Sequence, residues 1–203
     1  RNDVLKLTDL YANQGFAYVD VAPNVKQDPE NLLVDIAFDI KKGQEVYFEK
    51  IIISGNTKTR DKVIRRQLRV YEQELFSSKR LKRSVRNLYR LDFFGDVKVD
   101  TTKGSADDKM VVKIDVAEKS TGAFSFGAGY GNEEKLFGTV SIAERNLFGR
   151  GQTLELKGTF GSKTQNIDLS FTEPYIKDMP LSGTVTLYNW YYSYNEYDKD
   201  SFG

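Results

Sequence analysis

The sequence predicts small α+β modules with the order β-α-α-β-β, followed by antiparallel strands of a transmembrane β-barrel that is incomplete in this chain. Helix-like and strand-like stretches alternate up to about residue 119. From residue 122 the chain consists of segments of about ten residues with alternating apolar and polar side chains, the length that a tilted strand needs to cross a bilayer. No apolar window is long enough for a transmembrane helix.

The composition argues against an enzyme. The 203 residues include no cysteine and no histidine, which removes thiol chemistry, disulfides, histidine acid–base catalysis and the usual zinc sites. No carboxylate pair and no nucleophile with a base stand out. We therefore expect no catalytic residue, no metal and no cofactor. The chain opens with Arg1-Asn2-Asp3 and lacks a signal-like start, so we expect any secretory signal to lie upstream.

The first segment, residues 1–42, reads as part of a module. Val4, Leu7 and Tyr11 repeat at helical spacing, and Gly15 is a plausible helix stop. Two strands are predicted over 16–25 and 32–40, joined by a turn at Asp28-Pro29-Glu30-Asn31. A helix and one hairpin make a thin domain, so we expect upstream elements to belong to it.

The second segment, residues 43–119, reads as a complete module. A strand over 45–53 is followed by a turn at Ser54-Gly55-Asn56 and by a helix from about Thr59, whose hydroxyl can cap it. A second helix is predicted to begin near Ser77, and strands over 96–101 and 110–117 complete the order. The first segment ends with the same element order, which predicts tandem repeats of one module.

The third segment, residues 120–203, is predicted to hold five strands. Phe124, Phe126, Ala128 and Tyr130 share one face of the first of them, and later strands alternate in the same way. A soluble meander with one solvated face is the alternative. Five successive hairpin-connected strands of near-constant length favour the barrel. So do aromatic residues at strand ends, where an interfacial girdle belongs: Phe148, Tyr175 and residues 188–192.

Particular motifs resemble a known family. The stretches 122–131 (GAFSFGAGYG), 144–151 (ERNLFGRG) and 171–175 (FTEPY) resemble the opening barrel strands and first periplasmic turns of BamA-type assembly factors. The two modules resemble their POTRA domains, with Gly55-Asn56 and residues 91–94 (LDFF) at the expected places. The chain departs from the family pattern in length, because the closing strands and the Arg-Gly-Phe loop are absent.

The resemblance implies a location and a set of partners. It places the barrel in the outer membrane of a Gram-negative-type cell, with the POTRA modules in the periplasm. It implies insertion of nascent β-barrels without covalent chemistry, as part of a BAM complex. The implied partners are unfolded outer-membrane protein clients, accessory outer-membrane lipoproteins and the lipid bilayer.

The resemblance also indicates two sites. Strand 122–131 would form the lateral seam, where the first strand pairs with the last or with a client. Its predicted residues are Phe124, Phe126, Gly127, Gly129, Tyr130 and Gly131. By position, Arg65, Arg66 and Glu72 match the segment that docks an accessory lipoprotein. Small lumen-facing residues that let a barrel curve are the alternative explanation for the glycines.

The basic stretch 58–90 holds twelve Lys or Arg residues against three acidic ones. Phosphate binding is disfavoured because the helices lie between strands of one small domain and a transmembrane segment follows, so we expect no nucleic acid. A solvated basic face and a protein-docking surface both remain open. For the whole chain, the alternatives to an assembly factor are a related polypeptide-transporting outer-membrane barrel and a soluble periplasmic scaffold module.

Overall fold

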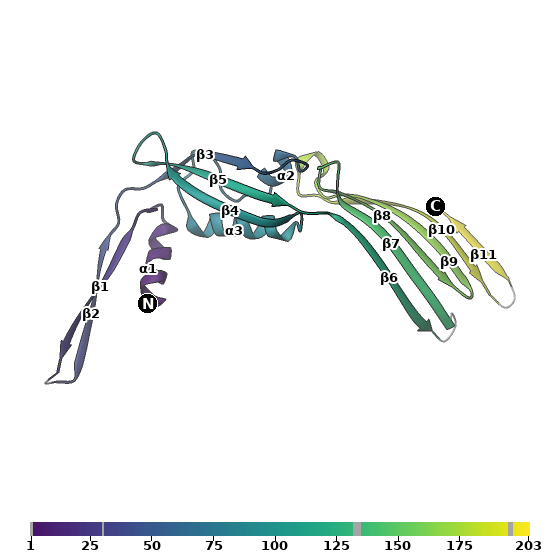
Figure 1. Cartoon of the computed structure of the whole chain (residues 1–203), viewed down its shortest axis with the longest axis horizontal. Helices are drawn as coiled ribbons and strands as arrows, with labels where there is room; N and C mark the ends of the chain where they lie inside the picture. The colour runs from purple at the N-terminus through teal and green to yellow at the C-terminus, as the bar shows by residue number, and fades with distance from the viewer. Residues whose placement is uncertain (1, 30, 132–134, 195–196) are drawn as a thin grey trace. The chain divides into compact units, whose positions relative to one another are not determined.

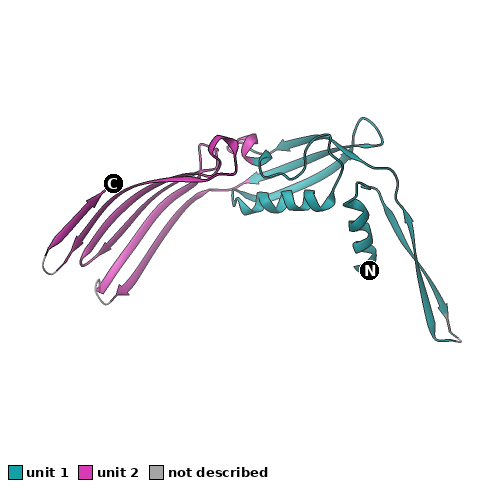
Figure 2. Ribbon diagram, turned by 180° about the vertical axis from the view of Figure 1, so that it is seen from behind, with its two compact units in different colours: residues 1–56, 64–117 teal, residues 57–63, 118–203 magenta. Residues whose placement is uncertain are grey.

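The computed structural model describes residues 2–29, 31–131, 135–194 and 197–203, which form two compact units (Figure 2). Unit 1 comprises residues 1–56 and 64–117, and unit 2 comprises residues 57–63 and 118–203. The short loop 57–63 thus belongs with the C-terminal sheet, although the chain on both sides of it belongs to unit 1. In the described ranges, no helix is both long and apolar enough to span a membrane.

Unit 1 begins with α1 (Asn2–Ala12) and the antiparallel hairpin of β1 (Asp20–Asp28) and β2 (Leu33–Lys41). Gly15 terminates the helix as predicted, with φ at +107°, a value that side-chain-bearing residues rarely adopt. β1 begins four residues later than predicted because the chain first turns tightly: Phe16 N donates to Tyr11 O at 3.2 Å. In the predicted hairpin turn, Glu30 lies outside the described residues.

The hairpin leaves an apolar face exposed. Val25 pairs with Ile36, and both side chains are more than half exposed, as is Val34. In the described residues this sheet contains only these two strands. A two-stranded hairpin is only marginally stable by itself in water.

The second module of unit 1 has the predicted order of elements (Figure 1). They are β3 (Tyr47–Ser54), α2 (Asp61–Arg65), α3 (Ser78–Arg90), β4 (Phe94–Lys103) and β5 (Lys109–Glu118). β5 is the central strand of the sheet, between β3 and β4, and β3 runs parallel to it. A parallel neighbour requires a crossover, which the two helices provide.

The core of this module lies between α3 and one face of the sheet. Phe48, Ile114 and Leu88 are almost completely buried there, and Val112 joins them from β5. α3 begins next to Ser77, as predicted, and Ser77 is its N-cap because its side chain accepts a hydrogen bond from Arg80 N. The only polar side chain of α3 in this core, Ser84, accepts from Arg69 N at 2.7 Å and donates to Arg80 O at 2.9 Å.

The sheet of unit 2 is an antiparallel meander in chain order (Figure 1). Its strands are β6 (Gly122–Gly131), β7 (Lys135–Leu147), β8 (Gln152–Gly161), β9 (Thr164–Glu173), β10 (Gly183–Ser193) and β11 (Asp198–Phe202). A short 3₁₀ turn, η1 (Ile176–Asp178), lies between β9 and β10. β6 and β11 are the two edges, so the barrel is not closed by the described residues.

The prediction of five strands was one short. β11 pairs with β10 from Asn189↔Phe202 to Ser193↔Asp198. Its sequence, DKDSF, is charged and lacks alternating apolar residues, so periodicity does not reveal it.

The predicted aromatic girdle is also only partly correct. Tyr188, Trp190 and Tyr192 alternate onto the polar face of the sheet, where the Trp190 indole donates to Asp168 Oδ1 at 2.7 Å. Asn166 Nδ2 donates to the Tyr192 hydroxyl at 2.9 Å. Residues 188–192 were predicted to belong to the girdle because of their position along the strand. Period-two alternation, however, decides which face of the sheet each ring occupies.

Candidate functional sites: the β6 edge, the β3 edge and the junction loop

β6 combines one free edge with two different faces. In the described sheet it pairs only with β7, in an unbroken register from Gly122↔Glu144 to Gly131↔Lys135. Phe124, Phe126 and Tyr130 lie on one face with exposed fractions of 65%, 83% and 76%. Gly127, Gly129 and Gly131 lie on the other face. The structure therefore brings the predicted seam residues together on one edge strand.

The glycines of β6 do not all play the same part. A Cβ at Gly129 would lie 2.4 Å from the ring of its cross-strand neighbour Phe137, so that ring occupies the space above the glycine. At Gly127 a Cβ would meet Thr139 Oγ1 at 3.0 Å. An aromatic ring over a cross-strand glycine strengthens strand pairing. Packing against β7 therefore explains Gly129, and it favours the β7 side of β6 over the free side.

The exposed face of β6 continues across the sheet as aligned apolar rows. One row runs in register through Phe124, Ile142, Leu156, Leu169 and Leu187. All five side chains are at least 38% exposed. A soluble protein rarely exposes so large a patch, whereas the outer face of a membrane barrel requires one.

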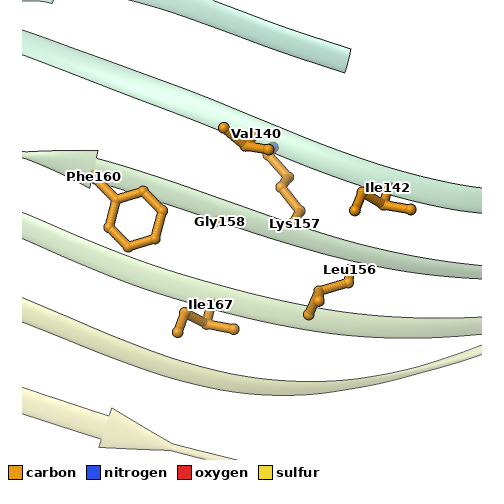
Figure 3. Close-up of a pocket in the computed structure, with 7 residues that line it drawn as sticks. All are labelled: Val140, Ile142, Leu156, Lys157, Gly158, Phe160 and Ile167. Atoms are coloured by element: carbon orange, nitrogen blue, oxygen red, sulfur yellow. The ribbon is translucent and has the colours of Figure 1, made fainter. Parts of the chain in front are cut away.

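Gly158 interrupts the next row and leaves a shallow hollow (Figure 3). It pairs with Val140 on one side and Ile167 on the other, and the three positions line a hollow of about 210 Å³ with Phe160 and Leu156. A Cβ at Gly158 would lie 2.7 Å from the Phe160 ring. The apolar face is thus continuous but not smooth.

The second candidate site lies at the edge of β3. Segment 73–76 covers the first half of this edge: Gln73 N donates to Phe48 O at 2.6 Å, and Phe48 N donates to Glu74 O at 2.9 Å. Beyond that point, the outward-pointing backbone belongs to Ile51. Unpaired edge groups of this kind attract other strands unless they are covered.

Arg65 and Glu72 cover Ile51 together. Glu72 Oε1 accepts from Ile51 N at 3.0 Å, and Arg65 Nη2 donates to Ile51 O at 3.2 Å. The two side chains also approach each other, with Arg65 Nη1 4.0 Å from Glu72 Oε1, while each stays almost half exposed. Arg66 follows α2 directly and is half-buried. Two of the three predicted docking residues, Arg65 and Glu72, therefore form an ion pair across a strand edge, a role that their spacing in the sequence did not reveal.

A third site, which the sequence did not predict, is the junction loop, defined here as residues 57–63 and thus including the first three residues of α2. The Glu118 carboxylate at the end of β5 accepts hydrogen bonds from the backbone N–H groups of Thr57 (3.1 Å), Lys58 (2.8 Å) and Thr59 (2.6 Å), and from the Thr57 hydroxyl (2.7 Å). Partial burial raises the pKa of Glu118, but the hydrogen bonds from Thr59, Thr57 and Lys58 outweigh it and lower the pKa from 4.5 to about 2. The carboxylate is therefore ionised at neutral pH.

The junction loop is also attached to the turn between β7 and β8. Asn146 Nδ2 donates to the Thr59 hydroxyl at 2.9 Å, and Asn146 Oδ1 accepts from Gly151 N at 2.8 Å. Arg60 N donates to Gly149 O at 2.9 Å. One buried amide thus joins the loop to the turn and closes the turn at the same time.

Gly149 fits this contact for two reasons. Its φ is +69°, and a Cβ there would lie only 1.9 Å from the Lys58 carbonyl oxygen. On the other side of the loop, Lys62 Nζ lies 2.6 Å from Asp178 Oδ2. Asn146, Gly149 and Gly151 all belong to the 144–151 motif. The contacts with the junction loop therefore explain why these residue types occur at these three motif positions.

Comparison with known proteins decides the family. The family model "POTRA: Surface antigen variable number repeat" matches residues 1–43 and 46–119, and the "Omp85 superfamily domain" matches residues 146–203. Two curated BamA proteins match up to 97% of the chain. The chain belongs to the BamA-type assembly factors. The POTRA modules and the antiparallel strands of an outer-membrane barrel predicted from the sequence are thereby confirmed. The protein resides in the outer membrane, with its POTRA modules in the periplasm.

Relatives support this family over most of the chain. The BamA outer membrane protein assembly factor of Nitratidesulfovibrio vulgaris is 31% identical over 97% of the chain, and that of Neisseria meningitidis is 33% identical over 79%. The chain spans about a quarter and a fifth of their lengths, respectively. Among solved structures, BamA from Haemophilus ducreyi lacking POTRA domains 1–3 matches 93% of the chain and 36% of its own, with a TM-score of 0.88 and 27% identity. CdiB from Escherichia coli, at 12% identity and a TM-score of 0.57, shares the fold.

Proposed function

We propose that this protein assembles outer-membrane β-barrel proteins and inserts them into the bilayer, with the free edge of β6 as the template for an incoming strand. In this proposal, residues 1–42 are part of one POTRA module, residues 43–119 are a complete module, and residues 120–203 open the barrel. The observation that carries it is an edge strand with an exposed apolar face, in a chain whose relatives are named assembly factors. No covalent chemistry is required, because an open strand edge can pair with an unfolded client by β-augmentation.

The asymmetry of β6 supports this mechanism. On the β7 side, Phe137 packs over Gly129, so that pairing gains an aromatic contact. On the free side, a glycine contributes no side chain to a partner strand. Pairing with a closing strand should therefore open more easily than pairing with β7. The exposed apolar rows provide the face that contacts lipid hydrocarbon.

Disulfide locks test the mechanism. In the full-length protein, a cysteine in place of Gly127 is paired with one in the closing strand, and the control pair is Ser125→Cys with Ser141→Cys, which are register partners on β6 and β7. Directly opposite residues in antiparallel strands lie within disulfide reach. The lock to the closing strand should block client insertion in reconstituted liposomes, and a reducing agent should restore it, whereas the β6–β7 lock should leave insertion unchanged. Equal insertion by both locked proteins excludes entry through the β6 edge.

We further propose that Arg65, Arg66 and Glu72 bind an accessory outer-membrane lipoprotein. The support is the half-exposed ion pair of Arg65 and Glu72 on the β3 edge, at positions where the family resemblance implies a docking segment. A partner that engages Arg65 and Glu72 contacts charged groups that the Ile51 backbone already orients. Oriented charges lose less conformational entropy on binding than flexible ones.

The docking proposal needs two variants, because Glu72 also holds the Ile51 backbone. Glu72→Lys reverses the charge, whereas Glu72→Gln removes the charge and keeps an amide oxygen that can accept from Ile51 N. We expect Glu72→Lys to weaken lipoprotein binding by about 1–3 kcal/mol, and Glu72→Gln to weaken it less, while both variants stay folded. Co-purification and calorimetric titration measure this. If Glu72→Lys binds the lipoprotein as tightly as the parent, the role of Arg65 and Glu72 is only to cover the β3 edge.

In the transporter alternative, the client is a polypeptide that is exported through the barrel instead of being inserted into the bilayer. Such export would continue when the β6 edge is locked to the closing strand. The same disulfide experiment therefore separates the two functions. The scaffold alternative required a soluble sheet, and the match of this sheet to a BamA barrel argues against it.

A further inference from the structure

Helix α3 carries a one-sided row of cations. Six of its thirteen residues are Lys or Arg, and none is acidic. At about 100° per residue, four of the six positions fall within an arc of about 60°, on the side opposite to buried Ser84 and Leu88. We call these four exposed residues the α3 stripe: Lys79, Arg83, Arg86 and Arg90. The stripe is about 16 Å long, since it covers eleven steps of 1.5 Å.

The stripe is not neutralised by the part of the chain that the structure describes. The two other cations of the helix have partners, because Lys82 Nζ lies 2.7 Å from Asp9 Oδ1 and Arg80 Nη1 lies 2.7 Å from Glu74 Oε2. In the described ranges, no carboxylate lies within 4.0 Å of a stripe cation.

The stripe also works against the helix. Like charges at positions i and i+4, such as Lys79 with Arg83, repel one another. A cation in the first turn, as at Lys79, further opposes the positive N-terminal end of the helix dipole. The helix therefore carries these charges at a cost to its own stability, and the surrounding acidic residues do not offset that cost.

A narrow recess runs beside the N-terminal half of the stripe. Asp9 and Asn13 of α1 form one wall, Lys79, Lys82 and Arg86 form the other, and the recess has a volume of about 160 Å³. Asn13 Oδ1 accepts from Lys79 N at 2.7 Å, which holds α1 against the start of α3. Two of the stripe cations, Lys79 and Arg86, thus border a recess that α1 closes on one side.

We propose that the α3 stripe binds an acidic segment of a partner protein, one that presents carboxylates in a row along a helix or an extended strand. Guanidinium groups bind carboxylates in a planar, two-pronged geometry, and three of the four stripe residues are arginines. A row that is one residue wide, beside a recess walled by α1, suits a narrow acidic segment better than a flat anionic lipid surface. This site is separate from the Arg65–Glu72 pair and does not depend on docking there.

A peptide pair tests the geometry. The probe is an alanine-based helical peptide with four glutamates at i, i+4, i+7 and i+11, and the control peptide has the same composition with its glutamates spread around the helix. Binding to the intact protein in nonionic detergent is followed by fluorescence anisotropy at several salt concentrations. We expect the one-sided peptide to bind more tightly, with a Kd that rises with salt as exposed ion pairs are screened.

Two triple variants with the same change in net charge complete the test. Arg83→Gln, Arg86→Gln and Arg90→Gln together should raise the Kd of the one-sided peptide about tenfold. The control combines Lys50→Gln, Lys98→Gln and Lys113→Gln on the strands of the same module, and it should change the Kd less than twofold. The stripe variant should melt no lower than the parent, because it removes like-charge repulsion.

Four results overturn the proposal. If the protein binds the two peptides with equal affinity, or if the two triple variants raise the Kd equally, the peptide is held by nonspecific attraction to positive charge. If the one-sided peptide does not bind, the α3 stripe is a solvated face without a binding role. If nanodisc-held protein instead binds vesicles of phosphatidylcholine mixed with phosphatidylglycerol in a way that depends on Arg83, Arg86 and Arg90, the surface is a lipid site.

Discussion

At the scale of single residues, Glu118 gives the sharpest pH prediction. Its carboxylate holds three consecutive N–H groups of the junction loop, and hydrogen bonding lowers its pKa from 4.5 to about 2. Because the folded pKa is depressed, its contribution to stability is complete above about pH 4.5 and is lost as the pH falls toward 2. The protection of the Thr57, Lys58 and Thr59 amides against hydrogen exchange, measured relative to the intrinsic rate at each pH, should therefore fall across that window. In Glu118→Gln this pH-dependent loss of protection should be absent.

Glu118→Ala should have a larger effect, because it leaves the three N–H groups without their acceptor. We expect a loss of roughly 1–2 kcal/mol in unfolding free energy, at the lower end for unsatisfied groups because the site is partly open to solvent. Chemical denaturation in detergent measures the loss. A fall of the same size in Glu118→Gln would show that the amide cannot replace the carboxylate, and that charge dominates the interaction.

Gly149 permits a matched comparison with Gly43. Both residues have φ near +70°, but a Cβ at Gly149 would lie 1.9 Å from the Lys58 carbonyl oxygen, whereas a Cβ at Gly43 would meet nothing within 4 Å. Gly43→Ala should cost about 1 kcal/mol from backbone strain alone. Gly149→Ala should cost at least 1 kcal/mol more, because the turn must move away from the junction loop. Similar melting temperatures for the two variants would mean that the loop–turn contact yields easily.

At the scale of elements, the pairing of β6 with β7 includes an aromatic contact that can be removed by itself. Phe137→Ala uncovers Gly129 and should weaken this pairing by roughly 1 kcal/mol. Hydrogen exchange along β6 should become faster, while exchange in β9 should not change. Gly138→Ala on the same strand is the control, since its Cβ would approach only Gly127 O, at 3.9 Å. Faster exchange in both variants would indicate general loosening of β7.

Local patterns predicted the elements well where one signal dominated. Ser77 before an apolar-periodic stretch located the start of α3, and alternation located β6 to β10. β11 escaped because a short charged strand at a sheet edge has no apolar face to reveal it. Long-range contacts escaped for a different reason: Glu118 meets Thr59 across 59 positions in the chain. Likewise, the spacing of Arg65 and Glu72 carries no sign that Ile51 lies between them.

At the scale of the whole molecule, the two open edges of the sheet determine whether residues 1–203 can insert into a bilayer. β6 and β11 each have a neighbour on one side only, while the apolar rows between them suit a bilayer. In lipid hydrocarbon, every unpaired backbone group at such an edge costs several kcal/mol, because no water is present to hydrogen-bond with it. Residues 1–203 alone should therefore bind liposomes at the surface without forming protease-protected strands, whereas a protein extended through its closing strands should become protected. Protection of β7 to β9 in the short chain would mean that the edges find partners in a second copy, and crosslinking of Gly127→Cys variants would then detect β6–β6 or β6–β11 pairs between molecules.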